Sequence, residues 1–104
     1  MAFVVTALWT AKPGLENEVA DAIQELIPLS RAESGNLYYQ PHRDPENSQA
    51  FYFYEQYVDK AGYEAHGASE HFQRIGVGVA IPMLESRERH FYQTWEPGSE
   101  STLR

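Results

Sequence analysis

The sequence of 104 residues contains no cysteine. This absence excludes disulfide bonds, zinc–thiolate sites, iron–sulfur clusters and a cysteine nucleophile. It also agrees with a cytoplasmic location, which we expect for this protein.

Basic residues are scarce. Eight Lys and Arg stand against 15 Asp and Glu, which gives a formal net charge of -7. Nucleic-acid binding needs a basic surface that engages phosphates. The nearest candidate is the segment at residues 87–90 (Arg-Glu-Arg-His), which is short, contains an acid, and is interpreted as a solvated strand end. We therefore expect neither nucleic acid nor an anionic membrane as a partner.

Long apolar segments are also missing. No apolar run approaches the roughly 20 residues that span a bilayer. Residues 1–12 lack the basic start and apolar centre of a signal peptide. The composition, with 42% hydrophobic and 22% charged residues, is that of an ordinary globular protein. The length fits one domain, which we place at residues 1–96, followed by a mobile tail at residues 97–104.

Four segments rich in β-branched and aromatic residues predict strands. They lie at residues 3–11, 36–43, 50–58 and about 84–95. The segment Asp44-Pro45-Glu46-Asn47 has strong turn chemistry, so the second and third strands are expected to form a β-hairpin.

Apolar residues at helical spacing predict an amphipathic helix after the first strand, and Pro28 is expected to kink or end it. Asp59 can cap a short helix, which Gly67 is expected to break. Ser69 can cap a further helix that runs to about Ile81.

The resulting order is strand, helix, strand, strand, helix, strand. This order predicts an α+β fold of the ferredoxin-like type, with an antiparallel sheet and helices on one face. The strand at residues 50–58 is unusual because neither of its faces is polar throughout. Since helices can cover only one face, we expect a second copy to cover the other, as a homodimer.

Polar residues within apolar elements are the candidates for chemistry. Glu55 interrupts an aromatic strand, and it is either structurally paired or part of a pocket. His66 and His71 flank the expected helix break, where both imidazoles can face one cleft and transfer protons, or can serve as helix caps. Asn36 can stabilise an oxyanion or complete the turn in which it lies.

Aromatic residues are the candidates for binding a flat ligand, although most are expected to belong to the core. Those assigned to substrate binding, together with His71, are Trp9, Tyr39, Phe53, Tyr57 and Phe72. No metal is expected, because the five-residue spacing of His66 and His71 does not place both on one face of a helix. The chain has no phosphate-binding loop and no serine elbow, and Gly76-Val77-Gly78 is not a nucleotide motif.

Four blocks of the sequence together resemble the antibiotic-biosynthesis monooxygenase family. The blocks are Glu33-Ser34-Gly35-Asn36-Leu37, His42-Arg43-Asp44-Pro45-Glu46, Tyr54-Glu55-Gln56-Tyr57, and Ala65-His66 followed by Ser69-Glu70-His71-Phe72. The resemblance covers nearly the whole chain up to Trp95. It implies a ferredoxin-like protomer and a dimeric α+β barrel with one pocket per protomer.

The family that the blocks resemble includes cofactor-free oxygenases of quinols and anthrone-like phenols, and haem-degrading enzymes in which a histidine late in the second helix ligates the iron. Residues 75–80 contain no histidine. The blocks look closer to the quinol monooxygenase branch, and equally close to an isomerase of a phosphorylated autoinducer.

Three hypotheses follow. The first is a cofactor-independent monooxygenase that takes a phenolic substrate and dioxygen, with His66 as base, Glu55 orienting it and Asn36 holding the oxyanion. The second is an isomerase of a small phosphorylated keto compound that uses the same base, with cationic help from Arg43 or Arg74. The third is a non-catalytic binding or stress protein, in which the polar residues are structural.

Overall fold

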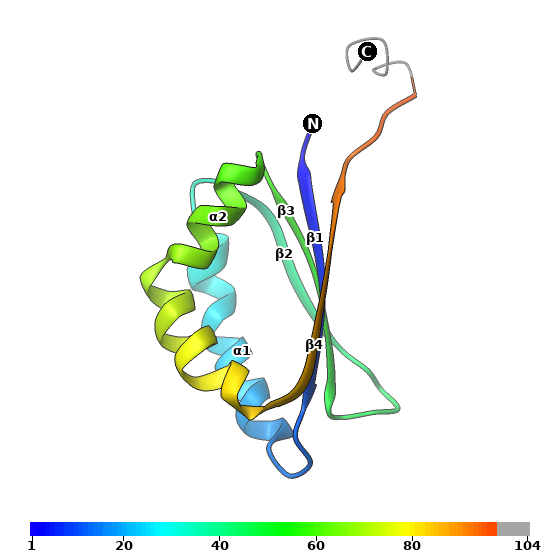
Figure 1. Cartoon of the computed structure of the whole chain (residues 1–104), viewed down its shortest axis with the longest axis vertical. Coiled ribbons are helices and arrows are strands. Elements are labelled where there is room, and N and C mark those ends of the chain that lie inside the picture. Colours follow the sequence, from blue (N-terminus) through cyan, green and yellow to red (C-terminus); the bar gives the residue numbers. More distant parts are fainter. Residues whose placement is uncertain (98–104) are drawn as a thin grey trace.

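The computed structural model describes residues 1–97 and contains a four-stranded antiparallel sheet with helices on one face (Figure 1). The strands, in the spatial order β2-β3-β1-β4, are β1 (Phe3–Ala11), β2 (Asn36–Arg43), β3 (Ala50–Tyr57) and β4 (Leu84–Gln93). The helices are α1 (Glu16–Arg31), α2 (Lys60–Ala68), the π-helix η1 (Phe72–Ala80) and the short 3-10 helix η2 (Ile81–Met83). The expected α+β, ferredoxin-like architecture is confirmed.

The expected tail, apart from Pro97, lies outside the described residues. Within residues 1–97, no helix is long and apolar enough to cross a membrane.

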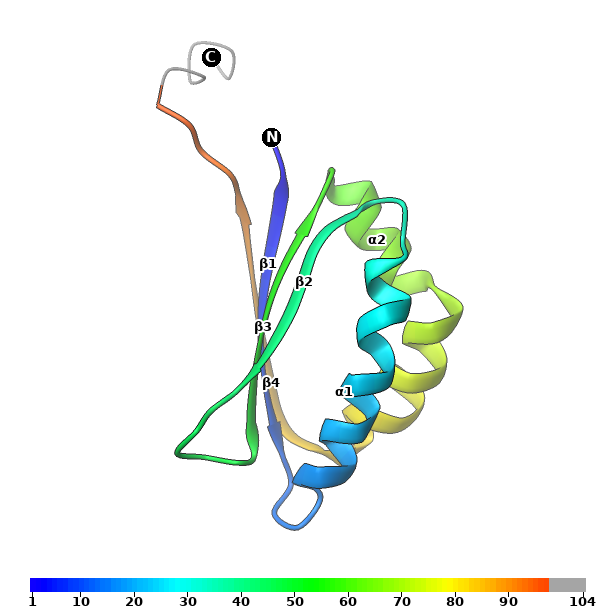
Figure 2. The same ribbon diagram turned by 180° about the vertical axis from the view of Figure 1, so that it is seen from behind.

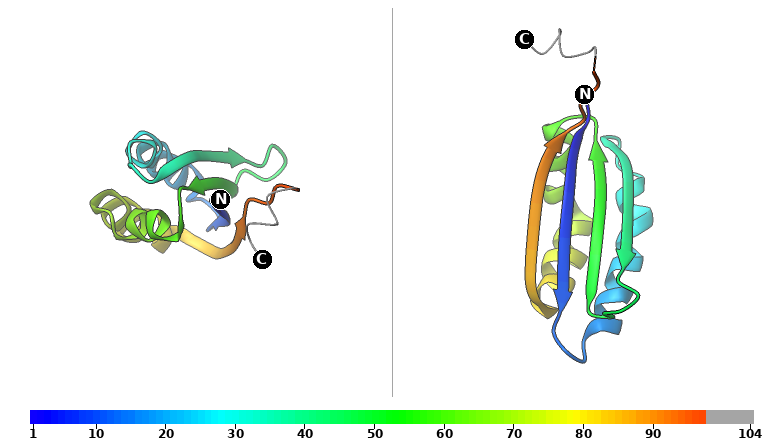
Figure 3. Two further views of the ribbon diagram at one scale, coloured as in Figure 1. Left: turned by 90° about the horizontal axis from the view of Figure 1, so that it is seen from above. Right: turned by 90° about the vertical axis from the view of Figure 1, so that its right-hand side faces the viewer.

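The two faces of the sheet differ in what covers them. The first face of β1 presents Val5, Ala7 and Trp9 to the helices, and all three are buried. The opposite face carries no helix in the described part of the chain (Figures 2 and 3). Leu8 and Tyr52 lie there as cross-strand partners, and both are exposed. Neither face of β3 is polar throughout because one face lies in the core and the other, which is aromatic, is not covered by a helix.

Pro28 does not end α1, which continues to Arg31. A proline in a helix removes one hydrogen bond, here the one to the carbonyl of Gln24. Gln24 and Pro28 both lie on the exposed side of α1, where water can bond to that carbonyl. Pro28 itself still accepts a hydrogen bond from the amide of Ala32 at 3.1 Å. The last turn therefore forms despite the proline.

The break between the second and third helices lies at Ser69 and not at Gly67. The helix α2 runs through Gly67 to Ala68, and Asp59 caps its start by accepting from the amide of Gly62, as expected. Ser69 is extended, its hydroxyl donates to the carbonyl of His66 at 2.7 Å, and it accepts from the amide of Phe72 at 3.2 Å. One serine therefore ends α2 and starts the next helical segment.

The helix η1 has π geometry over nine residues, which is a rare form that is frequently found at functional sites. Within it, the ring of Phe72 lies directly over Gly76, since a Cβ at residue 76 would come within 2.9 Å of that ring. The missing side chain of Gly76 lets the aromatic ring pack against the helix on the side that faces the sheet.

Candidate active site

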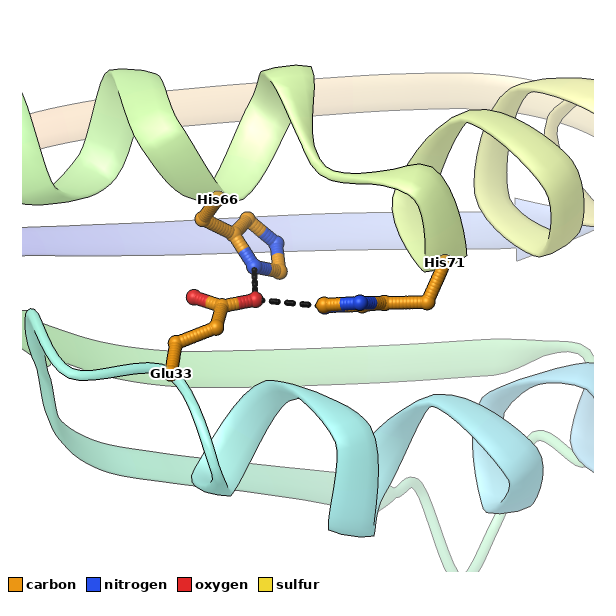
Figure 4. A group of neighbouring side chains, drawn as sticks. All are labelled: Glu33, His66 and His71. Atoms are coloured by element: carbon orange, nitrogen blue, oxygen red, sulfur yellow. Dashed lines mark hydrogen bonds and ion pairs between the residues drawn. The ribbon is translucent and has the colours of Figure 1, made fainter.

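Glu33, His66 and His71 converge between the turn after α1 and the helical segments that carry the two histidines (Figure 4). The Nδ1 atom of His66 lies 2.7 Å from Oε2 of Glu33, and the Nε2 atom of His71 lies 2.6 Å from the same oxygen. The side chain of His66 is 4% exposed, that of Glu33 14% and that of His71 16%. The three side chains therefore form a largely dry hydrogen-bonded cluster.

The shared oxygen of Glu33 determines the tautomers of both imidazoles. An ionised carboxylate can only accept hydrogen bonds, so both ring nitrogens that contact it carry hydrogen. In the neutral ring of His66, this leaves Nε2 unprotonated and able to accept a proton. Nε2 makes no hydrogen bond with any residue in the range 1–97. This arrangement gives an oriented base with a free nitrogen, as in a carboxylate–histidine pair of a hydrolase.

Two glycines bring Glu33 and His66 together. Glu33 lies in the turn after α1, two residues before Gly35. The backbone of Gly35 touches that of Gly62 so closely that a Cβ on Gly35 would lie 2.9 Å from the Cα of Gly62. Gly62 and His66 are four residues apart, so they lie on the same side of α2. The close contact of the two backbones therefore holds His66 against the turn that carries Glu33.

The helix break at Ser69 brings His71 to the same carboxylate. Ser69 changes the direction of the chain between His66 and His71, so the five-residue spacing no longer describes a single helix. The two histidines were expected to face one cleft, and the structure brings them to a common partner. Only His66 among them also borders the cavity described below.

A cavity of about 350 Å³ lies between the helices α2, η1 and η2 and the strands β1, β3 and β4. This volume is at the lower end of the range for small-molecule sites. Its lining residues are Val5, Ala7, Trp9, Glu55, Tyr63, His66, Gly67, Phe72, Val77, Ile81, Arg87 and Arg89. The walls are mainly apolar and aromatic, with a base, a carboxyl group and two guanidinium groups among them.

Glu55 is buried at 6% exposure in the middle of β3 and borders the cavity. Its Oε1 accepts a hydrogen bond from the hydroxyl of Tyr57 at 2.6 Å. Burial raises the pKa of the Glu55 carboxyl, and the hydrogen bond from Tyr57 and the nearby His66 offset part of this effect. Glu55 was expected to orient His66, but it makes no hydrogen bond with His66 in the described chain. The carboxylate that orients His66 is Glu33.

Asn36 lies away from the cavity. Its side-chain amide donates to the carbonyls of Tyr38 at 3.1 Å and Gln56 at 3.4 Å, where the pairing of β2 with β3 is irregular. The amide therefore completes the start of the strand. In this chain the Asn36 amide does not border the cavity and is not positioned to bind a substrate oxyanion there.

The expected aromatic residues divide into two groups. Trp9 and Phe72 line the cavity. Tyr39, Phe53 and Tyr57 are buried in the core at 3% exposure or less and do not line it. Burial, together with the charge of Glu55, raises the pKa of both tyrosines, so they remain protonated hydroxyls.

The cluster also has the residue types that hold metal ions. One carboxylate and two imidazoles are a common ligand set, and the ligand atoms of Glu33, His66 and His71 lie within 4.8 Å of one another. Without an ion, the same atoms are joined by the two hydrogen bonds to Oε2 of Glu33. The other oxygen of Glu33, Oε1, is buried and accepts no hydrogen bond from residues 1–97.

Four residues of the site were missed by the reasoning from sequence, namely Glu33, Tyr63, Arg87 and Arg89. Glu33 stood within the first of the four motif blocks, but its turn position gave no reason to select it. Arg87 and Arg89 are two residues apart on β4, and this spacing indicates that both point to the same face of the sheet.

Comparisons with known proteins agree with this architecture. Residues 2–76 match the family model described as antibiotic biosynthesis monooxygenase. PA3566 from Pseudomonas aeruginosa is 32% identical over 91% of this chain and 95% of its own, with a TM-score of 0.84. SO0527 from Shewanella oneidensis is 26% identical over 89% of this chain and 90% of its own, with a TM-score of 0.83. A solved structure described as an antibiotic biosynthesis monooxygenase is 25% identical over 90% of this chain and 99% of its own, with a TM-score of 0.84.

A search of curated proteins gave no match. The family model nevertheless covers well over half of the sequence, and similar structures span nearly all of it. The chain therefore belongs to the antibiotic biosynthesis monooxygenase family.

Proposed function

We propose that this protein is a cofactor-independent monooxygenase that acts on a quinol or another phenolic small molecule. The observation that carries the proposal is the geometry of His66. Its Nδ1 donates to the partly buried Glu33, and its ring borders a cavity with aromatic walls. Similar structures described as monooxygenases support oxygen chemistry as the reaction class.

The proposed reaction begins when Nε2 of His66 takes a proton from a phenolic hydroxyl of the substrate. The resulting anion is rich in electrons and transfers one electron to dioxygen, and the two radicals combine to form a carbon–oxygen bond. Loss of water from the peroxide leaves a hydroxylated quinone. One oxygen atom enters the substrate, the other leaves as water, and the quinol supplies all four electrons, so no separate reductant is needed.

The remaining lining residues have roles that fit this reaction. Trp9 and Phe72 can pack against the ring of the substrate. Glu55, in its protonated form, can donate a hydrogen bond to a substrate oxygen on which negative charge develops. This role replaces the one expected for Asn36, whose amide is engaged at the start of β2. Glu33 acts on the substrate only through His66 and is a positioning residue.

The direct test is dioxygen uptake by metal-free protein with a panel of hydroquinones. The proposal predicts uptake with formation of a hydroxyquinone, and the same rate after exhaustive chelation. Purified protein that holds a stoichiometric metal, and loses turnover when the metal is removed, would contradict it and would make Glu33, His66 and His71 the candidate ligands.

The same assay distinguishes the two alternatives. Turnover of a phosphorylated keto sugar without oxygen uptake would indicate an isomerase. Tight binding of hydroquinones without any turnover would indicate a binding protein. The cationic partners first considered for the isomerase do not reach the cavity, because Arg43 contacts Ser48, Asn17 and Phe51, and Arg74 pairs with Glu25 and Glu70.

We also propose that the protein is a homodimer joined through the open face of the sheet. The exposed aromatic residues Tyr38, Tyr52 and Tyr92 lie on this face, together with Leu8. A charge in the centre of the face, as in Tyr52→Asp, is expected to weaken the dimer because it would be desolvated without a partner. Light scattering that gives the mass of a single chain at micromolar concentration would contradict the dimer.

A further inference from the structure

Two arginines on β4 face the cavity. Arg87 pairs in register with Trp9 of β1, and Arg89 pairs with Ala7, so both point to the side of the sheet that the helices cover. Both are among the lining residues, together with His66. The short basic segment at residues 87–90 is therefore more than a solvated strand end, because half of it is directed toward the candidate active site.

Neither arginine forms an ion pair with a carboxylate within the described chain. Arg87 makes no hydrogen bond or ion pair with residues 1–97. Arg89 donates to the hydroxyl of Tyr63 at 2.6 Å and lies 5.5 Å above the ring of Phe91. These contacts orient its guanidinium group. Its positive charge also opposes the rise in the pKa of the buried Glu55 carboxyl, although the two groups form no ion pair within residues 1–97. Arg74, by contrast, pairs with two glutamates.

The net charge of the chain makes this placement informative. Acids outnumber bases by 15 to eight, yet two of the eight bases border one cavity of about 350 Å³. The carboxyl group on the cavity wall, Glu55, is buried and hydrogen-bonded to Tyr57. Guanidinium groups bind carboxylates and phosphates through paired hydrogen bonds. The cavity thus combines a proton acceptor, aromatic walls and, at its solvent-exposed edge, two guanidinium groups that form no ion pair with residues 1–97.

We propose that the substrate carries an oxyanion group, a carboxylate or a phosphate, which Arg87 and Arg89 bind while its acidic hydroxyl faces His66. The inference rests on the proposed function in assigning this cavity as the substrate site and in placing a phenolic hydroxyl at His66. The substrate class is then a small aromatic acid with a phenolic hydroxyl. Tyr63 supports the site by holding Arg89, and Trp9 and Phe72 contact the ring.

The test is calorimetric binding without oxygen, so that no turnover is involved. Three probes that share a phenolic ring are compared, namely hydroquinone, gentisate and hydroquinone monophosphate. The anionic probes are expected to bind at least about tenfold more tightly than hydroquinone, which corresponds to about 1.4 kcal/mol. The carboxylate and phosphate arms show which oxyanion the two arginines prefer. The preference should weaken as salt is added.

Variants then identify the residues responsible. Arg87→Gln and Arg89→Gln should each reduce the preference for the anionic probes over hydroquinone, and the double variant should remove it. Arg74→Gln is the matched control, because Arg74 lies outside this cavity, and it should leave all three affinities unchanged.

Equal binding of the neutral and anionic probes, or a preference that persists in the double variant, would overturn the proposal. So would a change in oligomeric mass in the double variant without any change in probe binding, since the arginines would then bind a second copy. Arginine-dependent binding without oxygen uptake would support this inference and contradict the monooxygenase proposal. Oxygen uptake with no preference for the anionic probes would support the monooxygenase proposal and contradict this inference.

Discussion

Two glutamates lie near His66, the partly buried Glu33 and the buried Glu55, and their surroundings differ. Glu33 lies in a turn and receives hydrogen bonds from two imidazoles on one oxygen. Glu55 lies within a strand and receives one from the neutral hydroxyl of Tyr57. Burial raises the pKa of Glu55, whereas Glu33 is only partly buried. The comparison teaches that position and partners, not residue type, decide which carboxyl group orients the base and which can act as an acid.

The largest effect is expected from removing the base that Glu33 orients. His66→Gln should lower turnover by about a hundredfold or more, because glutamine cannot accept the phenolic proton. Turnover is measured per folded molecule, with the melting temperature taken on the same sample. His42→Gln is a matched control on the opposite face of the sheet. Near-normal turnover in His66→Gln would remove His66 from the mechanism and leave His71 as the next candidate.

Glu33→Gln should have the next largest effect, with kcat falling by about tenfold or more and KM changing little. A glutamine at residue 33 can offer an amide hydrogen to an imidazole, which removes the constraint on the tautomer of His66. Glu55→Gln should leave that tautomer unchanged. Equal losses of kcat in the two variants, with the same tautomer in both, would contradict the separate roles assigned to the two glutamates.

The placement of Glu33 depends on the contact of Gly35 with Gly62, which Gly35→Ala should disturb. The new methyl group would lie 2.9 Å from the Cα of Gly62, so one backbone must shift. We expect a loss of about 1–3 kcal/mol of stability, as for other overpacked sites. Turnover should fall as well, because Glu33 moves away from His66.

Gly67→Ala provides the control for this prediction. Gly67 lies in α2, the helix that also contains Gly62, and a Cβ at Gly67 would meet nothing within 4 Å. Alanine should stabilise α2 slightly, since glycine is a poor helix former. Thermal unfolding of both variants checks the prediction, and equal melting temperatures would contradict it.

The smallest effect concerns the pH dependence that Glu55 contributes. Its pKa is raised in the folded protein, mainly by burial. As the pH rises from acid values, the unfolded chain therefore releases this proton before the folded chain does, and the stability contributed by Glu55 is lost. The glutamine in Glu55→Gln cannot ionise. The melting temperature of this variant, relative to that of the parent, should therefore increase as the pH rises.

Glu64→Gln, a change of the same kind at an exposed position of α2, is the control and should show no such gain. A difference between Glu55→Gln and the parent that is the same at every pH would mean that the Glu55 carboxyl has no raised pKa.

The sequence predicted the elements well because their signals are local. The first two strands match their expected bounds, and Asp59 and Ser69 cap the helices as expected. The helix does not end at Pro28 or break at Gly67, because a breaking residue is tolerated when water or a neighbouring cap compensates for it. Local signals identify such residues but do not show what surrounds them.

The site was predicted less completely because it depends on contacts between distant segments. His66, Glu55, Trp9 and Phe72 were selected and do border the cavity. Glu33 comes to His66 only through the packing of two glycines 27 positions apart, which no local pattern shows. Asn36 was selected because amides suit oxyanions, but its position at the start of a strand engages it with the backbone.

The central claim is that Glu33 holds His66 with a hydrogen on Nδ1 and leaves Nε2 free as the base. Nitrogen NMR of the histidine rings measures this directly, without a substrate, on protein whose His66 ring is neutral. We predict that the His66 signals show the Nδ1-protonated tautomer in the parent and in Glu55→Gln, and that this tautomer is lost in Glu33→Gln. A His66 ring with hydrogen on Nε2 in the parent protein would contradict the account.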